Sequence, residues 1–294
     1  MSKLNKHHHN ALKTMLHGLM TRYKERVSDV ETIIKAMIQH NLINNEHDII
    51  NDHIAFRTFG LPNLGIQSLE KIMLAYGYTK KDFYRFETKK LTAYWYSPPK
   101  DIANLPRLFI SQCEVNQLST KTQDIIKHYT KHITKDPVDK LNFENGNEID
   151  NFLHTPLWET PTWEDYEYVL NESEYAAWVL YNRYYLNHFT ITIQTLKKGY
   201  NTIELFNHFL ESIGIKLNAS GGKIKCSKDK KLIQSSTVAK TITTKFPHKN
   251  GQEQYHDIAG SYVEFAERIN NRDGFEVSNA DKIFESTFTS EINK

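Results

Sequence analysis

The chain has 294 residues, of which 39% are hydrophobic and 24% charged, a composition typical of a globular protein with a sizeable core. The 37 basic and 35 acidic residues give a net charge of +2, which excludes a general electrostatic attraction to nucleic acid or to anionic membranes. The longest apolar run, around 176–181, falls far short of the roughly 20 residues that span a bilayer. We therefore expect neither a nucleic-acid partner nor a membrane span.

The number of cysteines and the N-terminal sequence indicate in which cellular compartment the protein is expected. Cys113 and Cys226 are the only cysteines, too few for a disulfide framework and without the CxxC spacing of a zinc site. The N-terminal residues lack the apolar segment and the small-residue cleavage site of a secretory signal. Both features favour a reducing environment, and we expect a cytoplasmic protein.

The first half of the chain changes from helical to strand-like periodicity. Within residues 1–50, apolar residues recur at helical spacing in 12–20 and again in 30–38. Alternation then begins at His53. A strand, a helix and two strand-like regions are predicted in turn at 53–59, 66–76, 83–96 and 105–115.

The second half starts with a mainly helical region, 118–184, which prolines divide. Thereafter the chain returns to a strand, a helix, short strand-like pieces and a final strand, at 185–193, 202–213, 215–239 and 260–268.

These two halves follow the same plan. His53 to Gly77 spans 24 residues and His188 to Gly214 spans 26, and each interval holds a strand, a connection, a helix and a glycine. The pattern predicts one α+β domain built from duplicated βαβββ modules that form a curved sheet or barrel. Two unrelated α+β stretches are the alternative. The predicted divisions are a helical part, the first module, a helical insertion, the second module and a C-terminal tail, at 1–50, 51–117, 118–184, 185–270 and 271–294.

Three of the strands carry chemically reactive side chains on one face. Side chains two residues apart share a face of a strand, so His53 and Arg57 project together, while Glu264 projects from the final strand. His53, His188 and Glu264 suit a two-histidine, one-carboxylate metal site, which leaves three adjacent coordination positions open. These ligands suit Fe(II), and also Mn, Ni or Zn. Individually each residue has an ordinary alternative, such as Glu264 pairing with Arg268.

Three segments in this order, HIAFRTFG, LNHFTITI and GSYVEFAER, resemble the DUF1338 family, over about residues 10–290. This family includes the 2-oxoadipate dioxygenase/decarboxylases, also called hydroxyglutarate synthases. The resemblance implies a vicinal-oxygen-chelate-like fold, in which paired βαβββ modules surround one Fe(II) held by His53, His188 and Glu264. It also implies that Arg57 binds a substrate carboxylate, and that 2-oxoadipate and O2 become 2-hydroxyglutarate and CO2, a step of lysine breakdown.

The residue type and position of Arg57 agree with that implied role. Only eight of the 37 basic residues are arginine. Arg57 lies four residues after His53, about 13 Å along an extended strand at about 3.3 Å per residue, a reach suited to the distal carboxylate of a diacid. A guanidinium fork also matches a carboxylate in shape. Pairing of Arg57 with a structural acid is the alternative.

Weaker candidates lie in the segment 234–238, which is similar to a polar segment lining the pocket in the family. Gln234 and Ser236 could therefore contact substrate, although an ordinary strand with outward hydroxyls fits as well. Ser111 and Gln112 lie near the place where a related fold would put a further ligand, and neither is a good one. The chain also lacks the longer insertions of the bacterial enzymes, and no second substrate-gripping residue is predicted.

The favoured function is a mononuclear non-haem Fe(II) dioxygenase/decarboxylase acting on a 2-oxo diacid, with the 2-oxo acid and O2 as its partners. Two alternatives stay open: a glyoxalase-like isomerase or lyase of the same fold with Zn or Ni, and a non-catalytic protein that binds a small acid or a hydrophobic ligand. The sequence predicts no oligomeric state.

Overall fold

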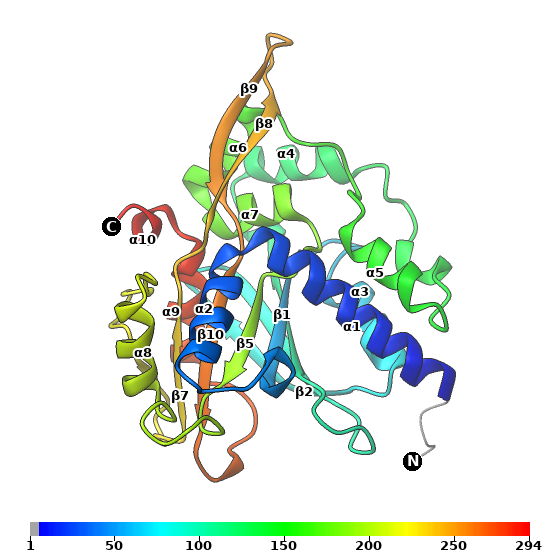
Figure 1. Cartoon of the computed structure of the whole chain (residues 1–294). Helices are drawn as coiled ribbons and strands as arrows, with labels where there is room; N and C mark the ends of the chain where they lie inside the picture. Colours follow the sequence, from blue (N-terminus) through cyan, green and yellow to red (C-terminus); the bar gives the residue numbers. More distant parts are fainter. Residues whose placement is uncertain (1–5) are drawn as a thin grey trace.

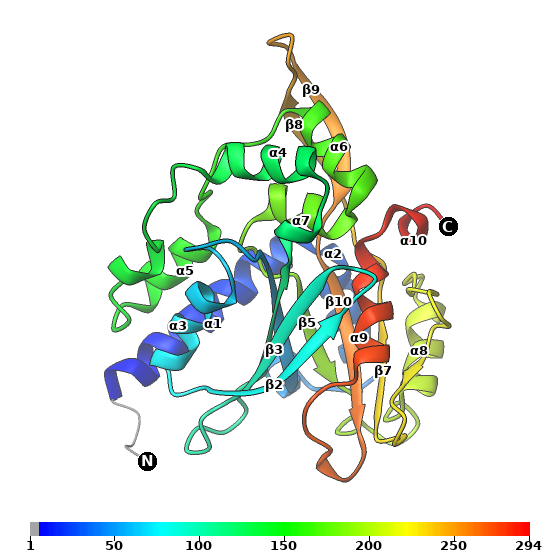
Figure 2. The same ribbon diagram turned by 180° about the vertical axis from the view of Figure 1, so that it is seen from behind.

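A strongly curled sheet forms the centre of the molecule in the computed structural model, which describes residues 6–294 (Figures 1 and 2). The order across the sheet is β2-β3-β4-β1-β5-β10-β7-β6. In chain order its strands are β1 (Asn51–Phe59), β2 (Thr79–Phe86), β3 (Leu91–Ser97), β4 (Arg107–Cys113), β5 (His188–Thr192), β6 (Lys225–Cys226), β7 (Leu232–Ser236) and β10 (Tyr262–Arg268).

The strand order confirms the predicted duplication. β1 and β5 meet antiparallel at the centre, and each has a parallel neighbour, β4 and β10 respectively. All pairings further out are antiparallel. The unit β1-α3-β2-β3-β4 is therefore repeated as β5-α8-β6-β7-β10, with α3 spanning Ile66–Ala75 and α8 spanning Ile203–Ser212. The two copies together form one half-barrel.

Helices cover the convex face of this sheet, because alternate side chains of the strands point there. Tyr23 of α1 (Lys6–Arg26) lies with its ring 6.2 Å from that of Phe189 in β5. In the second half, Phe206 of α8 lies 5.2 Å from Phe265 in β10. The neighbouring residues His188 and Glu264 consequently point to the concave face.

The other helices before β5 begin with α2, which follows α1, and continue with four helices between the two repeats. Their bounds are α2 (Ser28–Gln39), α4 (Thr120–Thr130), α5 (Gly146–His154), α6 (Trp163–Glu172) and α7 (Glu174–Asn182), and short 3-10 turns lie at Glu46–Asp48, Val115–Gln117 and Pro137–Lys140. α7 contacts β1 and so brings aromatic side chains towards the concave face.

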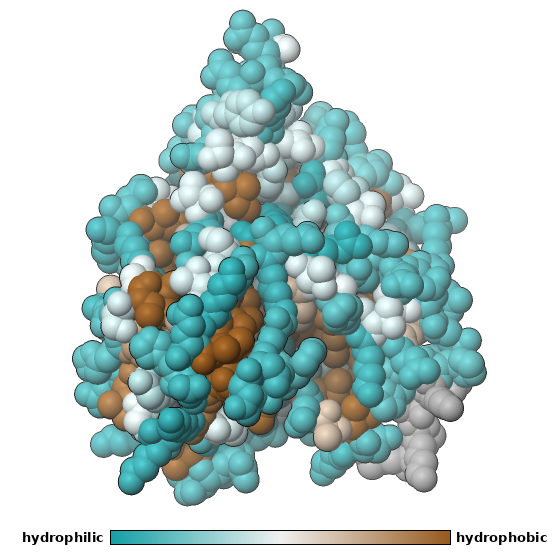
Figure 3. Space-filling view, in the orientation of Figure 1, coloured by the Kyte–Doolittle hydropathy of each residue, from teal (hydrophilic) through white to brown (hydrophobic). Residues whose placement is uncertain are grey.

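A two-stranded hairpin, β8 (Thr241–Pro247) and β9 (Glu253–Ala259), interrupts the second repeat between β7 and β10. No element is predicted there from the sequence, although Asn250-Gly251 between alternating segments is a hairpin signal. Phe246, close to the turn end of β8, packs the hairpin against α6, with its ring 5.3 Å from that of Trp163. The hairpin projects beyond the other elements, and its tip is hydrophilic (Figures 1 and 3).

The C-terminal segment forms a wall of the molecule, whereas the sequence predicts only a tail from residue 271 onwards. It contains α9 (Val277–Phe284), a 3-10 turn (Glu285–Thr287) and α10 (Thr289–Ile292). α9 contacts both edge strands of the curled sheet, β2 and β6, and therefore lies across the opening between them (Figure 2). Among the described residues, no helix is both long and apolar enough to cross a membrane.

Candidate metal centre and active site

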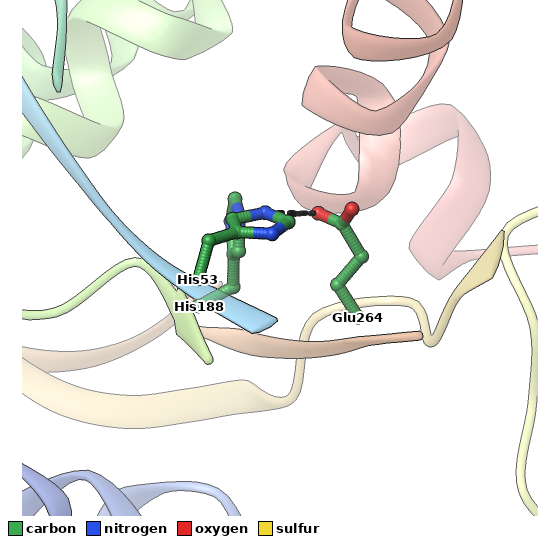
Figure 4. Close-up of side chains that lie close together, drawn as sticks. All are labelled: His53, His188 and Glu264. Carbon is green, nitrogen blue, oxygen red and sulfur yellow. Dashed lines mark hydrogen bonds and ion pairs between the residues drawn. The ribbon is translucent and has the colours of Figure 1, made fainter. Parts of the chain in front are cut away.

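Three predicted ligands converge on the concave face of the sheet, each from a different strand (Figure 4). His53 comes from β1, His188 from β5 and Glu264 from β10. His188 Nε2 lies 3.3 Å from His53 Nε2 and 3.1 Å from Glu264 Oε2, and His53 Nε2 lies 3.5 Å from the same oxygen. All three side chains are buried, at 1%, 5% and 1% exposure for His53, His188 and Glu264.

The spacing of these atoms fits a divalent metal. Two ligands about 2.1 Å from one ion are about 3.0 Å apart at octahedral angles and about 3.4 Å apart at tetrahedral angles. The three observed separations, from 3.1 to 3.5 Å, cover the same range. Two imidazole nitrogens and a carboxylate oxygen are the donors of a facial triad, but they do not by themselves select Fe, Mn, Ni or Zn.

Each histidine is oriented by the residue that precedes it. His53 Nδ1 donates to Asp52 Oδ2 at 2.8 Å, and His188 Nδ1 donates to Asn187 Oδ1 at 3.0 Å. A proton on Nδ1 leaves Nε2 free to ligate a metal. Sequence reasoning missed this pair, although Asp52-His53 and Asn187-His188 occupy corresponding places in the repeats.

Both carboxylates at the site are anionic. Burial would raise the pKa of Glu264, but the adjacent imidazoles of His53 and His188 lower it to about 2. Burial would likewise raise the pKa of Asp52, and the Arg268 guanidinium and His53 hold it well below its ordinary value. Arg268 contacts Asp52 through Nε at 2.7 Å and Nη2 at 2.9 Å. Arg268 is thus bound to Asp52, and Glu264 is left to the metal site.

Gln234 fixes the orientation of the Glu264 carboxylate. Its Nε2 donates to Glu264 Oε1 at 2.5 Å, and its Oε1 accepts from Asn279 Nδ2 at 2.9 Å. This leaves Glu264 Oε2 directed at the histidines. Gln234 also lines the pocket, whereas the Ser236 hydroxyl lies 2.9 Å from that of Ser286 and is not part of the pocket wall. Substrate contact by Ser236 stays a prediction without a supporting contact.

A pocket extends from the three ligands along the concave face and ends at the C-terminal wall. Besides the ligands it is lined by Ala55, Phe56, Arg57, Phe109, Ser111, Asn187, Gln234, Tyr262, Phe275, Ala280, Ile283 and Phe284. The lining is mostly apolar, with a few polar groups, as is usual for a small-molecule site.

Arg57 is a buried cation in this pocket. Nη1 donates to Thr287 Oγ1 at 2.8 Å and Nη2 donates to the Phe284 carbonyl at 3.2 Å. Aromatic rings surround the guanidinium, with Tyr175 at 4.9 Å and Trp178 at 5.2 Å. Within residues 6–294 no carboxylate forms an ion pair with Arg57, and burial lowers its pKa. The alternative role, pairing with a structural acid, has no contact to support it.

The two repeats differ at the position of the carboxylate ligand. His53 is paired with Arg107 in β4, and His188 is paired with Tyr262 in β10. Two residues further along these strands, Phe109 therefore corresponds to Glu264. Ser111 and Gln112, noted in the sequence as near a further ligand position, have other contacts: Ser111 with the Tyr175 hydroxyl, and Gln112 with the backbone of α3. Phe109 gives the metal site an apolar side.

A solved structure with a dissimilar sequence shares this fold. A glyoxalase superfamily protein from Ralstonia eutropha superposes with a TM-score of 0.73, covering 89% of this chain and 84% of its own. The two sequences are 18% identical, so the similarity is one of fold alone. The molecule therefore has a glyoxalase-like fold, and a buried cluster of two histidines and one glutamate that could hold a metal lies at its centre.

Sequence comparison identifies a family within this broad class of folds. Residues 15–271 match the family described as 2-oxoadipate dioxygenase/decarboxylase, and the chain belongs to this family. A relative from Arabidopsis thaliana, a chloroplastic 2-oxoadipate dioxygenase/decarboxylase, is 43% identical over 275 residues, which cover 85% of this chain and 71% of the relative. The hydroxyglutarate synthase of Oryza sativa, solved in complex with 2-oxoadipate, is 36% identical with a TM-score of 0.87, covering 100% of this chain and 97% of its own.

Proposed function

We propose that this protein is a mononuclear non-haem Fe(II) dioxygenase/decarboxylase that converts 2-oxoadipate and O2 into 2-hydroxyglutarate and CO2. The observation that carries the proposal is a buried two-histidine, one-glutamate triad in the same pocket as a buried arginine without an acidic partner. Relatives named for this reaction, at 37–43% identity, support it. The atoms of this reaction balance, because 2-hydroxyglutarate and CO2 together contain two more oxygen atoms than 2-oxoadipate, and one O2 supplies both.

The chain's own residues would divide the work at this site. His53, His188 and Glu264 would hold the metal, which when bound supplies a template and a redox centre for a 2-oxo acid and O2. Arg57 would hold the carboxylate at the far end of the diacid. The apolar lining, including Phe109 and Phe275, would exclude water from the reacting groups. Gln234 would keep Glu264 in its ligating orientation.

Oxygen uptake by the reconstituted protein tests the proposal. Protein loaded anaerobically with Fe(II) should consume O2 only when 2-oxoadipate is present, and should release one CO2 and one 2-hydroxyglutarate for each O2. His188→Ala, which removes one ligand, should abolish uptake. No uptake across a panel of 2-oxo acids would overturn the proposal. Turnover without O2 by the Zn- or Ni-loaded protein would favour a glyoxalase-like isomerase or lyase.

Location and pathway are part of the same proposal. We propose that the protein is cytoplasmic and that it acts in lysine breakdown. Both cysteines are free, with Cys113 buried and Cys226 exposed, and free thiols suit a reducing compartment. The plant relatives are named chloroplastic, or chloroplastic and amyloplastic. Fractionation of the native cells tests the location, and accumulation of 2-oxoadipate in lysine-fed cells without this protein tests the pathway.

A further inference from the structure

Three buried side-chain groups in the pocket have no partner in hydrogen-bonding geometry, although Arg57 and the Tyr262 hydroxyl lie close enough to interact with each other. They are Arg57 Nε, the Tyr262 hydroxyl and Asn187 Nδ2, and each belongs to a side chain no more than 1% exposed. Leaving such a group unsatisfied costs about 1–3 kcal/mol, so native proteins rarely keep several together. All three can donate a hydrogen bond, and the pocket is therefore complementary to a ligand rich in acceptor oxygens.

This concentration of donors is specific to the pocket. The other buried unpartnered side-chain atoms of the described residues belong to side chains that do not line it, such as Tyr76 and Asn207. By contrast, Asp52, the counterpart of Asn187 in the first repeat, has both oxygens occupied, by His53 and Arg268. Of the three donors, Arg57 Nε comes from the first repeat, and Asn187 and Tyr262 come from the second.

Tyr262 lies next to the candidate metal ligand His188 and lines the same pocket as Arg57. It lies two residues before Glu264 in β10 and so projects from the same face, with its ring centroid 4.8 Å from that of His188. Its hydroxyl can donate a hydrogen bond and lines the same pocket as Arg57.

The contacts of Arg57 leave room for a second donor. Its Nη1 and Nη2 already donate to Thr287 and Phe284 of the C-terminal wall, whereas Nε is unpartnered. A carboxylate has two oxygens that each require donors when buried. We propose that the Tyr262 hydroxyl binds the distal carboxylate of the 2-oxo diacid together with Arg57 Nε, and so sets the preference for diacids over monoacids. This inference rests on the proposed function, because it assigns a part of the same substrate site.

Tyr262→Phe tests the inference, because it removes only the hydroxyl and keeps the ring against His188. On the Fe(II)-loaded protein, KM for 2-oxoadipate should rise about 10-fold to 100-fold, the effect of losing a hydrogen bond to a charged group. kcat should change little, and the constants for 2-oxohexanoate, which has a methyl group in place of the distal carboxylate, should stay within about 2-fold. Anaerobic calorimetry should show the same loss in affinity for 2-oxoadipate.

Tyr184→Phe is the matched control, because its buried hydroxyl donates to the Leu64 carbonyl and does not line the pocket. It should keep the diacid preference. An unchanged KM in Tyr262→Phe, an equal rise for both substrates, or a loss of bound metal would each overturn the inference while leaving the proposed function intact. If the unaltered protein does not turn over 2-oxoadipate, the proposed function itself fails.

Discussion

At the scale of single residues, the contacts of Arg57 require an arginine and not a lysine. The guanidinium donates to two acceptors of the C-terminal wall and still has Nε free for a ligand. A lysine ammonium is a point charge without this planar fork. Arg57→Lys should therefore raise KM for 2-oxoadipate at least about 10-fold, the effect of about 1.4 kcal/mol, with unchanged metal content.

Steady-state kinetics across diacids and monoacids measures this effect. Arg85→Lys is the control, because the Arg85 side chain is half exposed on β2. If Arg57→Lys keeps the KM of the unaltered protein, Arg57 has no part in substrate binding.

Lys225 is a buried lysine that the proposed reaction does not use. Its Nζ donates to the Asn218 carbonyl at 2.7 Å, and burial lowers its pKa to about 8. Because the unfolded chain has a higher pKa, keeping this charge buried destabilises the fold below about pH 8, and the cost disappears as the pH rises towards about 10.5.

We expect Lys225→Met to raise the free energy of unfolding at pH 7 by about 1–3 kcal/mol, with a gain that shrinks towards pH 10. Chemical denaturation at a series of pH values measures it. Lys228→Met, at an exposed position of the same segment, should show no such dependence. A gain that does not change with pH would rule out desolvation of the lysine as its cause.

At the scale of elements, the C-terminal wall closes the pocket through Phe275. Its ring lies 4.8 Å from the ring of His53 and 5.0 Å from that of Phe109. Phe275→Ala should open a route for water, so that the ratio of 2-hydroxyglutarate formed to O2 consumed falls below that of the unaltered protein. The free energy of unfolding should also fall by about 3 kcal/mol, as it does when other buried phenylalanines are replaced by alanine.

Val277→Ala is the control for that experiment, since Val277 is 40% exposed at the start of α9. Parallel oxygen-electrode and product measurements give the ratio. Tight coupling in Phe275→Ala would show that the wall is not needed to exclude water.

The elements themselves could be predicted where local periodicity decides them. Strand β1 alternates from His53 onwards, and α3 and α8 each have an apolar stripe and end before a glycine with positive φ, Gly77 and Gly214. The β8–β9 hairpin was missed because Thr241–Ala259 has few apolar residues and gains its stability from contacts with α6. Apart from the Asn250-Gly251 turn, the hairpin has no strong local signal, because packing against a distant helix does not appear in the local sequence.

Part of the candidate site could also be predicted from local periodicity. The spacing of His53 and Arg57 on one strand, and the equivalent place of His188, can be read from alternation. The proximity of Tyr262 to Arg57 depends on the pairing of β10 with β5, and that of Phe275 depends on how the C-terminal wall folds back. The local sequence encodes neither the strand pairing nor the position of the C-terminal wall. These contacts can therefore be seen only in the structure.

At the scale of the whole molecule, the candidate metal site joins the two repeats, because His53 comes from the first and His188 and Glu264 from the second. A ligand that binds only the folded state stabilises it, by about 2.7 kcal/mol at 100 times Kd. Anaerobic addition of Fe(II) should therefore raise Tm by several degrees, and a chelator should reverse the change.

Scanning calorimetry with and without metal measures this stabilisation. His188→Ala should abolish the shift, whereas His128→Ala, at an exposed position of α4 outside the site, should retain it. An equal shift in both variants would place the stabilising metal elsewhere in the molecule.

The presence of Phe109 where the second repeat has Glu264 has a consequence for the chemistry of a duplicated protein. If both repeats carried a carboxylate at this position, four side chains would surround the ion and leave two neighbouring places of an octahedron. A substrate that chelates through two oxygens would then occupy both, and a gas molecule would find none. With Phe109 in the first repeat, a third place would stay open, so the proposed reaction would depend on a difference between the two repeats.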